Sequence, residues 1–229
     1  MAALVAGVAV LAAVGPRVVG DGVDMSLISS KFADALALQI QTVEQQTDAE
    51  IVTVLARRSD EYLYIPTLWA AFIAMLTPFA AHELGFWLEW QELFLYQWLI
   101  WLFASLLFRW QPLMMRLVPS SVRRHRASLM ARQQFLAQGL HHTRDRLGVL
   151  IFVSEAERYV EILVDQGVAA RINDESWQQM VRAFTQSVKQ GATEAGFAAC
   201  VRQVGELLIA TFPATAPQNE LPNRLVYLN

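Results

Sequence analysis

The residues best suited to chemistry in this sequence are carboxylates that flank two predicted strands. Asp165 closes the second strand of a predicted hairpin, and Asp174 follows at the start of a predicted helix. If the turn between them folds back, both carboxylates and the loop carbonyls could surround a hard cation such as Ca²⁺ or Mg²⁺. Asp60 follows an earlier predicted strand and would lie at the same end of the sheet if the strands run parallel. These three residues are the candidate metal ligands.

Each candidate ligand also has a structural interpretation. Asp174 is well placed to cap the helix that begins there, and Asp60 could belong to a solvated linker. His141 and His142 are adjacent, so on a helix they would point about 100° apart and chelate poorly. The single cysteine, Cys200, falls near an apolar helix stripe, where a small buried residue is expected. We therefore expect no catalytic residues, and no cofactor other than a Ca²⁺ or Mg²⁺ ion.

A long apolar part of the chain indicates a membrane anchor. Aliphatic and aromatic residues make up 55% of the chain and charged residues 17%, whereas soluble domains carry about 25% charged residues. Residues 62–81 carry no charge and would measure about 30 Å as a helix, which matches the hydrocarbon layer. Residues 93–108 form a second uncharged stretch; the alternative is a pair of buried core helices. The pattern predicts a transmembrane hairpin over residues 62–111.

Basic residues indicate the orientation of this hairpin. They flank both of its outer ends, while the loop between the two stretches carries Glu83, Glu89 and Glu92. The basic residues after the second stretch are Arg109, Arg116, Arg123, Arg124 and Arg126. By the positive-inside rule both outer ends are cytoplasmic, which predicts a multi-pass protein of the cytoplasmic (inner) membrane. We expect the last four arginines to form a basic patch that contacts anionic lipid headgroups of the bilayer and no nucleic acid.

The first 25 residues form an apolar segment with two interpretations. The segment has the hydrophobicity of a signal peptide, but no Lys or Arg precedes the apolar run. The alternative is that translation starts at Met25.

The remaining sequence predicts an α/β domain that the hairpin interrupts. The expected segments are a helix and a strand over residues 26–61, the hairpin over 62–111, a helix, two strands and two helices over 112–213, and an extended tail over 214–229. The helix after the hairpin is expected over residues 120–146, and its expected apolar stripe consists of Val122, Leu129, Gln133, Leu136, Leu140 and Leu147. Because three strands are too few to stand apart, we expect Ile51–Leu55 to pair in parallel with Val149–Val153 in a small mixed sheet.

Two stretches of this domain, "AEIVTVLA" and "GVLIFVSEAERYVEILVDQGVAARIND", followed by two closing helices, resemble the TPM domain family. The resemblance covers residues 26–56 and 119–213, and the inserted hairpin resembles a bacterial membrane-bound branch of that family. It implies an α/β/α sandwich around a small central sheet. It also implies, for some members, binding of a divalent metal, often calcium, and acid phosphatase activity.

The turn motif of the family, G-x-G-x-x-G-x-x-x-D, falls on the end of the strand hairpin. Gly167 and Asp174 match the middle glycine and the final aspartate, whereas Asp165 and Ala170 replace the other two glycines. A glycine is needed where the backbone takes a positive φ or approaches another group closely. The resemblance therefore implies a tight turn at Gly167.

Two functions from different classes fit these features. The first is non-enzymatic: a membrane-anchored accessory, assembly or adaptor subunit that docks on another membrane protein or complex. It is motivated by the incomplete glycine motif and the aromatic-rich hairpin. The second is a divalent-metal-dependent acid phosphatase at the membrane surface, with Asp165 and Asp174 as ligands and a metal-bound water attacking the phosphate.

Overall fold

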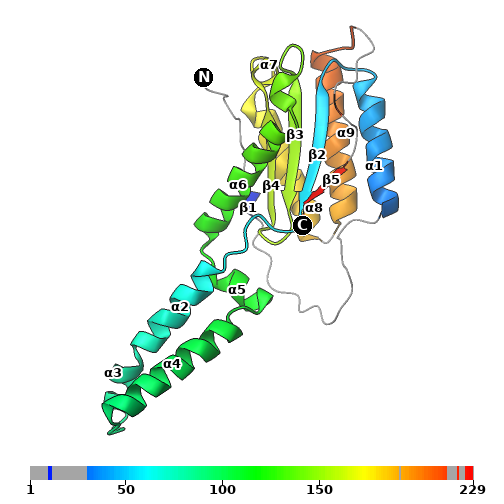
Figure 1. Ribbon diagram of the computed structural model, residues 1–229. Helices are drawn as coiled ribbons and strands as arrows, with labels where there is room; N and C mark the ends of the chain where they lie inside the picture. Colours follow the sequence, from blue (N-terminus) through cyan, green and yellow to red (C-terminus); the bar gives the residue numbers. More distant parts are fainter. Residues whose placement is uncertain (1–9, 12–29, 191, 216–220, 222–224, 229) are drawn as a thin grey trace. The chain divides into compact units, whose positions relative to one another are not determined.

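The chain folds into two compact units (Figure 1). The computed structural model describes residues 10–11, 30–190, 192–215, 221 and 225–228. The first unit, called the α/β unit below, comprises residues 1–59 and 124–229, and the second, called the helical unit, comprises residues 60–123. The helical unit is thus inserted into the α/β unit shortly after the first long strand.

A mixed five-stranded sheet forms the centre of the α/β unit, in the strand order β1-β4-β3-β2-β5. β2 (Glu50–Ala56) and β3 (Gly148–Ser154) run parallel, with Ile51 opposite Val149. β4 (Tyr159–Val164) folds back antiparallel to β3. Every residue of these three strands is buried, as expected for apolar strands covered on both faces. The predicted α/β class, the strand hairpin and the parallel pairing of the first strand are confirmed.

Two short strands from the ends of the chain form the edges of the sheet. β1 (Val10–Leu11) pairs antiparallel with β4, so two residues of the apolar N-terminal segment belong to the sheet. The rest of that segment, on which the signal-peptide and late-start interpretations depend, lies outside the described residues. β5 (Leu225–Leu228) pairs in parallel with β2. The sequence predicted only an extended tail there, because a run of four residues is too short for periodicity to identify a strand.

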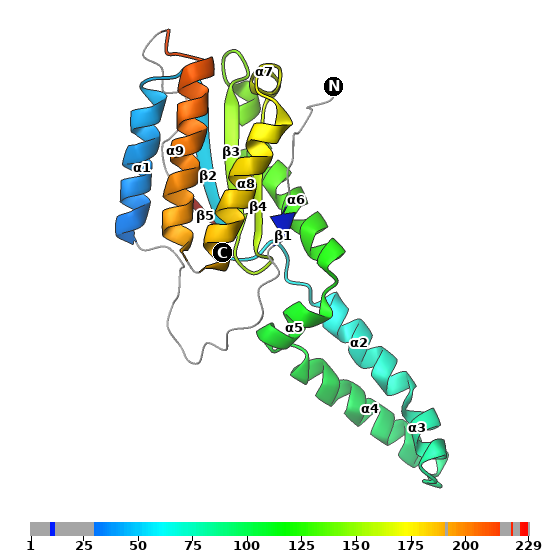
Figure 2. The ribbon, with the colours of Figure 1, turned by 180° about the vertical axis from the view of Figure 1, so that it is seen from behind.

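Helices cover both faces of the sheet (Figures 1 and 2). α1 (Ser30–Glu44), α8 (Asp174–Lys189) and α9 (Thr193–Thr211) pack on one face and build the larger core cluster, which includes the fully buried Trp177. α6 (Ser120–Ala137) contributes the buried side chains on the other face. The α/β unit is therefore an α/β/α sandwich, with three helices on one side and one on the other.

The face that α6 turns to the sheet is not the predicted one. Ala127, Ala131 and Phe135 are buried in the cluster with β2, β3 and β4. Leu129 and Leu136, which marked the expected stripe, are 44% and 60% exposed. The buried residues are spaced by four, so they share one face, and the small alanines let the helix lie close to the strands. The predicted stripe was wrong at Leu129 and Leu136, because the face of α6 that lies closest to the sheet carries small alanines, whereas Leu140 and Leu147 are buried as expected.

Two short helical turns complete the α/β unit. α6 was expected to continue to residue 146, but Gly139 adopts a left-handed conformation with φ of 76° and ends it. The 3₁₀ turn η1 (Leu140–His142) follows, and Leu140 packs over Gly148 at the start of β3. α7 (Gln166–Ala169) lies directly after β4.

The helical unit contains four helices, which are α2 (Tyr64–Met75), α3 (Thr77–Glu83), α4 (Trp90–Leu107) and α5 (Gln111–Leu117). α2 and α4 pack along each other as a hairpin (Figure 1). A small cluster of Tyr62, Ile65, Met114 and Val118 holds the start of α2 against α5. These helices correspond to the segment predicted as a transmembrane hairpin.

Candidate functional site

The surface of the helical unit consists largely of exposed, large apolar side chains. Leu68 and Phe79 are 64% and 69% exposed on α2 and α3, and Trp98 and Phe103 are 66% and 68% exposed on α4. Trp87, at the tip of the hairpin, is 92% exposed. Monomeric soluble proteins rarely expose contiguous apolar patches of more than a few hundred Å². A surface of this kind requires an apolar environment such as lipid or a protein partner.

The seam between α2 and α4 is made by small side chains. Ala70, Ala74 and Ala104 are 0%, 4% and 7% exposed, and Ala104 is the buried residue that α4 contributes. Ala70 and Ala74 lie one turn apart, which is the small-xxx-small spacing of packed transmembrane helices. A water-soluble helix pair buries its large apolar side chains, whereas this pair exposes them. The arrangement is typical of helices that associate in a bilayer, where small residues let the backbones approach.

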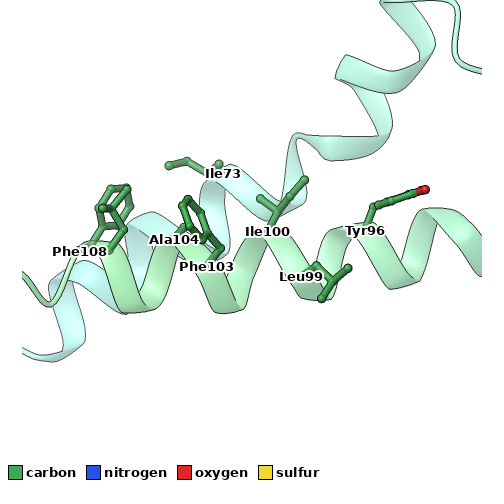
Figure 3. A pocket seen from close by; sticks show the side chains of 8 residues that line it. Ile73, Tyr96, Leu99, Ile100, Phe103, Ala104 and Phe108 are labelled. Atoms are coloured by element: carbon green, nitrogen blue, oxygen red, sulfur yellow. The ribbon is translucent and has the colours of Figure 1, made fainter.

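An open apolar groove of about 430 Å³ follows α4 on this surface (Figure 3). One side chain of α2, Ile73, contributes to it. The other lining residues, on α4 and directly after it, are Tyr96, Leu99, Ile100, Phe103, Ala104, Leu107 and Phe108. The lining offers hydrocarbon and aromatic surface over three turns of helix, so it suits an apolar ligand.

One helical stretch in the described part of the chain, Tyr64–Glu83 in α2 and α3, is long and apolar enough to cross a membrane by length and composition. α4 was expected to supply a second span, but Gln91, Glu92 and Gln97 lower its mean hydropathy. Glu92 has a local role, because its carboxylate accepts a hydrogen bond from the backbone N–H of Glu89 at 3.2 Å in the capping box that begins α4. By length and apolar composition, the described residues thus support one membrane span. The prediction of two spans in a multi-pass protein is not supported by this criterion.

The four arginines of the predicted basic patch lie on two consecutive helices. Arg116 is exposed in the last turn of α5, where a positive charge complements the helix dipole. Arg123, Arg124 and Arg126 lie in the first two turns of α6. Arg124 and Arg126 are exposed, whereas Arg123 is half-buried and its Nε atom has no hydrogen-bond partner among the described residues. Three of the four guanidinium groups are thus accessible to an anionic ligand.

A buried hydrogen-bonded cluster closes the carboxyl ends of β2 and β3. Glu157, which is fully buried in the β3–β4 turn, accepts hydrogen bonds from the backbone N–H of Ser59 at 3.0 Å and from the Ser154 hydroxyl. The Ser59 hydroxyl donates to Ser154 Oγ at 3.0 Å. Arg158 takes a left-handed φ of 52°, which lets the turn close over this cluster. The cluster ties the exit of β2, where the chain leaves for the helical unit, to the neighbouring strand hairpin.

A second buried cluster joins α6 to β4. Glu161 is 2% exposed, and its two carboxylate oxygens accept from the Ser128 hydroxyl at 3.3 Å and the Tyr159 hydroxyl at 3.0 Å. Burial raises the pKa of Glu161, and its hydrogen bonds and the charge of Arg132 oppose that rise. The sequence analysis did not single out Glu161. The available signal was an acidic residue within an otherwise apolar strand, which marks a buried carboxyl that needs partners.

A third buried acidic site lies where α1 leads into β2. Glu44 and Glu50 are each 5% exposed, and their side chains are hydrogen-bonded to one another. Glu44 Oε1 also accepts from the backbone N–H of Ile51 at 2.9 Å. Burial, and next to it the charge of Glu50, raises the pKa of Glu44 to about 8. A pKa in this range keeps Glu44 largely protonated at neutral pH, and the sequence analysis missed this pair.

The predicted metal ligands Asp165 and Asp174 lie at the two ends of the turn after β4. Asp165 is buried and caps α7, with Oδ1 accepting from the Gln166 backbone N–H at 2.7 Å. Its Oδ2 atom is buried with no hydrogen-bond partner in the described part of the chain. Asp174 is exposed at the first position of α8, and Asn173 provides the cap by accepting from the Ser176 N–H at 3.2 Å. The cap of α8 that was expected at Asp174 is thus provided by its neighbour Asn173.

Asp60 does not share the sheet end of Asp165. Asp165 follows β4, which runs antiparallel to β3, whereas Asp60 follows β2, which runs parallel to β3. The chain before Asp60 is held at the β3–β4 turn through Ser59, at the opposite end of β4 from Asp165. The condition under which Asp60 would join the other candidates is therefore not met. Among the described residues, no group of three or more His, Cys, Asp or Glu side chains is arranged to hold a metal ion.

Gly167, the motif glycine, is explained by a close backbone approach. A Cβ atom at this position would collide with the carbonyl oxygens of Asp145 and Arg146. Its own N–H donates to the Arg146 carbonyl at 3.1 Å. The turn predicted at Gly167 therefore packs against residues 145–146, and a larger side chain has no room there.

Comparison with known proteins agrees with this fold. Residues 114–207 match the family model of the TPM domain. Among solved structures, the chain is similar to the NMR structure of the BA42 protein from the psychrophilic bacterium Bizionia argentinensis, with 16% sequence identity and a TM-score of 0.56 over 90% of this chain and 98% of that one. A search of curated proteins found no match. Residues 114–207 are therefore similar to the TPM domain, and the chain shares its fold with the BA42 protein.

Proposed function

We propose that this protein with a TPM-like domain is anchored in the cytoplasmic membrane by its helical unit and serves as a non-enzymatic accessory, assembly or adaptor subunit of a membrane protein complex. In this proposal the hairpin of α2, α3 and α4 enters the bilayer, and the α/β unit faces the cytoplasm. The observation that supports the anchoring is the distribution of side chains on the hairpin, which buries alanines in the seam and exposes large apolar side chains on the surface.

Lipid removes the cost of that exposed surface. In water, each Å² of exposed apolar surface on the hairpin costs roughly 25 cal/mol of free energy. Lipid tails are as apolar as the side chains themselves, so this cost disappears in a bilayer. The polar Gln91 and Glu92 occupy the first turn of α4 and could stay at the interface. Residues 93–108 would then cross about 24 Å of hydrocarbon, a mismatch that bilayers accommodate by local thinning.

The basic residues support the orientation and a lipid contact. Arg116 follows the hairpin, and Arg124 and Arg126 are exposed on the helix that leads back to the α/β unit. Each such charge near an anionic leaflet contributes about 1 kcal/mol of attraction. The proposal therefore includes anionic headgroups as the ligands of these guanidinium groups.

The buried polar clusters favour a structural role over catalysis. Glu157 and Glu161 are 0% and 2% exposed and are hydrogen-bonded to neighbouring side chains. Glu157 holds the exit of β2, and Glu161 holds Ser128 in the middle of α6; these two elements flank the helical unit in the sequence. The clusters therefore fasten the elements on either side of the anchor, which supports a structural role.

The anchoring is tested with two leucines that are equally exposed. Leu68 on α2 and Leu38 on α1 are both 64% exposed. An arginine costs about 2.5–3.5 kcal/mol at the centre of a membrane span and less toward its ends, so Leu68→Arg should weaken the retention of the full chain by membranes during alkaline carbonate extraction. Leu38→Arg, on the α/β unit, should leave extraction unchanged. Retention of the Leu68→Arg chain at the wild-type level would contradict the anchoring.

The adaptor role and the topology need separate measurements. Affinity purification of the full chain in mild detergent should recover another membrane protein in a fixed ratio, and a chain that always purifies alone would contradict the adaptor role. A reporter inserted into the loop at residues 84–89 should be accessible from outside the membrane. A reporter after Asn229 should be accessible from the cytoplasm.

A second candidate function, a divalent-metal-dependent phosphatase, is favoured by one atom. Asp165 Oδ2 is buried without a hydrogen-bond partner among the described residues, and a cation would satisfy it. Hydrolysis of a generic phosphoester by the full chain should then require added Mg²⁺ or Ca²⁺. Activity should fall in Asp165→Asn and Asp174→Asn, and unchanged activity in both variants would refute this site.

A further inference from the structure

The outer edge of β2 is covered by the end of the same chain. β5 pairs with β2 over four residues, from Thr53 opposite Leu225 to Ala56 opposite Leu228. The backbone N–H of Arg57 donates to the Leu228 carbonyl at 2.8 Å and extends the pairing by one residue. The other edge of β2 pairs with β3 over seven residues, so β2 keeps its place in the sheet without β5.

The tail reaches this edge through a few separate contacts. Thr215 is held at the start of β2, where its backbone N–H and its hydroxyl both donate to the Asp48 carboxylate at 2.8 Å. Leu221 packs beside Gly139 at the end of α6. Val226 and Leu228 lie partly buried against the cluster beneath α6, and Leu225 enters the larger core cluster. The described residues of the tail thus place apolar side chains on both faces of the sheet edge.

The energetics favour exchange of this strand. Two of its side chains, Val226 and Leu228, are only partly buried, and Tyr227 is 46% exposed. Edge elements with few buried contacts open at a smaller free-energy cost than the central strands of a sheet. The opened edge of β2 would present a row of backbone groups next to apolar side chains, which is the surface that binds a peptide by strand addition.

We propose that the outer edge of β2 is a binding site for an extended apolar segment of the partner protein, which pairs in parallel with β2, and that β5 occupies this site in its absence. This inference deepens the proposed adaptor function, on which the identity of the occupant as a partner segment rests. The seated tail defines the chemistry of the segment: apolar residues at the positions of Leu225, Val226 and Leu228, and a tolerant position at Tyr227.

Charge near Tyr227 refines this recognition. Partial burial, and after it the negative charges of Glu155, Glu194 and Asp34, raises the pKa of Tyr227. These three acidic residues come from the β3–β4 turn, α9 and α1, so they surround the exposed position of β5 from separate elements. A partner segment that carries Lys or Arg at the position of Tyr227 would therefore bind more tightly than the tail itself.

Competition between the tail and a free peptide makes the site measurable. A tethered strand acts at an effective concentration on the order of mM when its linker is short and flexible. A peptide added at µM concentration therefore binds poorly to the wild-type chain and well to a chain whose tail is weakened. The probe is a labelled peptide with the sequence of residues 221–229, LPNRLVYLN, and a second version with Arg at the position of Tyr227.

The experiment uses the full chain in detergent and fluorescence anisotropy. Val226→Asp with Leu228→Asp removes two apolar contacts of the tail, so the peptide should bind at least about tenfold more tightly than to wild type. Tyr227→Ser, in the same strand, should bind like wild type. Thr53→Cys with Leu225→Cys places two cysteines opposite each other on paired strands. The oxidised form should bind no peptide, whereas the reduced form, whose tail has lost the apolar contact of Leu225, should bind the peptide more tightly than wild type does.

The disulfide variant, Thr53→Cys with Leu225→Cys, decides the proposal even if the aspartate variant does not fold. Equal peptide binding by the oxidised and reduced forms of the disulfide variant would overturn the site, whether or not a partner copurifies with the chain. A dimer of the reduced chain that excess peptide dissociates would overturn the assignment to a partner segment, since a second copy would then be the occupant. If the peptide binds only the reduced form of the disulfide variant and the chain always purifies alone, the adaptor function is refuted but the peptide site is retained.

Discussion

The buried acidic pair at the start of β2 predicts how the stability of this protein depends on pH. Glu44 and Glu50 are each 5% exposed and hydrogen-bonded to each other, so only one of them can be charged at low cost. Burial, the largest cause, raises the pKa of Glu44 from 4.5 to about 8. The perturbation that removes this titration with the least change in shape is Glu44→Gln.

The sign follows from proton binding. Between pH 4.5 and about 8 the folded chain holds a proton at Glu44 that the unfolded chain releases. The stabilisation is therefore complete below pH 4.5 and is lost as the pH rises through about 8. The slope is at most about 1.4 kcal/mol per pH unit, or roughly 5 kcal/mol as an upper bound across the window. For a chain of this size, each kcal/mol corresponds to about 2–4 °C in Tm.

Thermal unfolding of the full chain in detergent, followed by circular dichroism from pH 5 to 9, measures this effect. The Tm of the wild type should fall across the window relative to that of Glu44→Gln, and the variant should be the more stable of the two at pH 9. Glu206→Gln is the matched control, because its carboxylate is 70% exposed beside Arg202 and should leave the wild-type slope unchanged. Parallel curves for wild type and Glu44→Gln would refute the raised pKa of Glu44.

Three further predictions concern packing and reactivity. Ala74→Leu should overpack the seam of the helical hairpin by about 1–3 kcal/mol and lower the Tm in detergent, whereas Leu68→Ile on the exposed face should not; equal Tm values would contradict the alanine seam. Gly167→Ala should lower the Tm because its Cβ would collide with the Asp145 carbonyl, and an unchanged Tm would show that the turn can shift. Burial raises the pKa of the Cys200 thiol to about 12, so a thiol reagent at pH 8 should label it only after unfolding, and rapid labelling of the folded chain would contradict its burial.

Much of the α/β unit could be predicted because its signals are local. The runs that became β2, β3 and β4 are apolar and β-branched, and the short turn between the last two leaves only a hairpin as the connection. The long connection from β2 to β3 indicated a parallel pair, and the register of Ile51 with Val149 followed. The exposed apolar surface of the helical unit was also foreseeable, since no sequence rich in Trp, Phe and Leu offers a polar face there.

The candidate sites were harder to predict because they depend on which distant residues meet. Asp60 and Asp165 each follow a strand, but the direction of β4 places the residue after it at the opposite end from the exit of β2. The face of α6 could not be chosen from leucine spacing, because the closest approach to the sheet selects Ala127 and Ala131. The pKa of Glu44 depends on burial that α1 and β2 create only when they pack together.

Local order along the chain was therefore determined by the sequence itself: the succession of helices and strands, the strand hairpin and the apolar insertion after β2. Side-chain periodicity and backbone propensity act over a few residues, so they can be read without the fold. Only the tertiary structure decided that the last four described residues complete the edge of the sheet, and that burial raises the pKa of Glu44. Both features depend on contacts between distant segments, and these contacts contribute free energy only after the chain has folded. Four residues or one carboxyl carry too little local preference for the sequence to predict either feature.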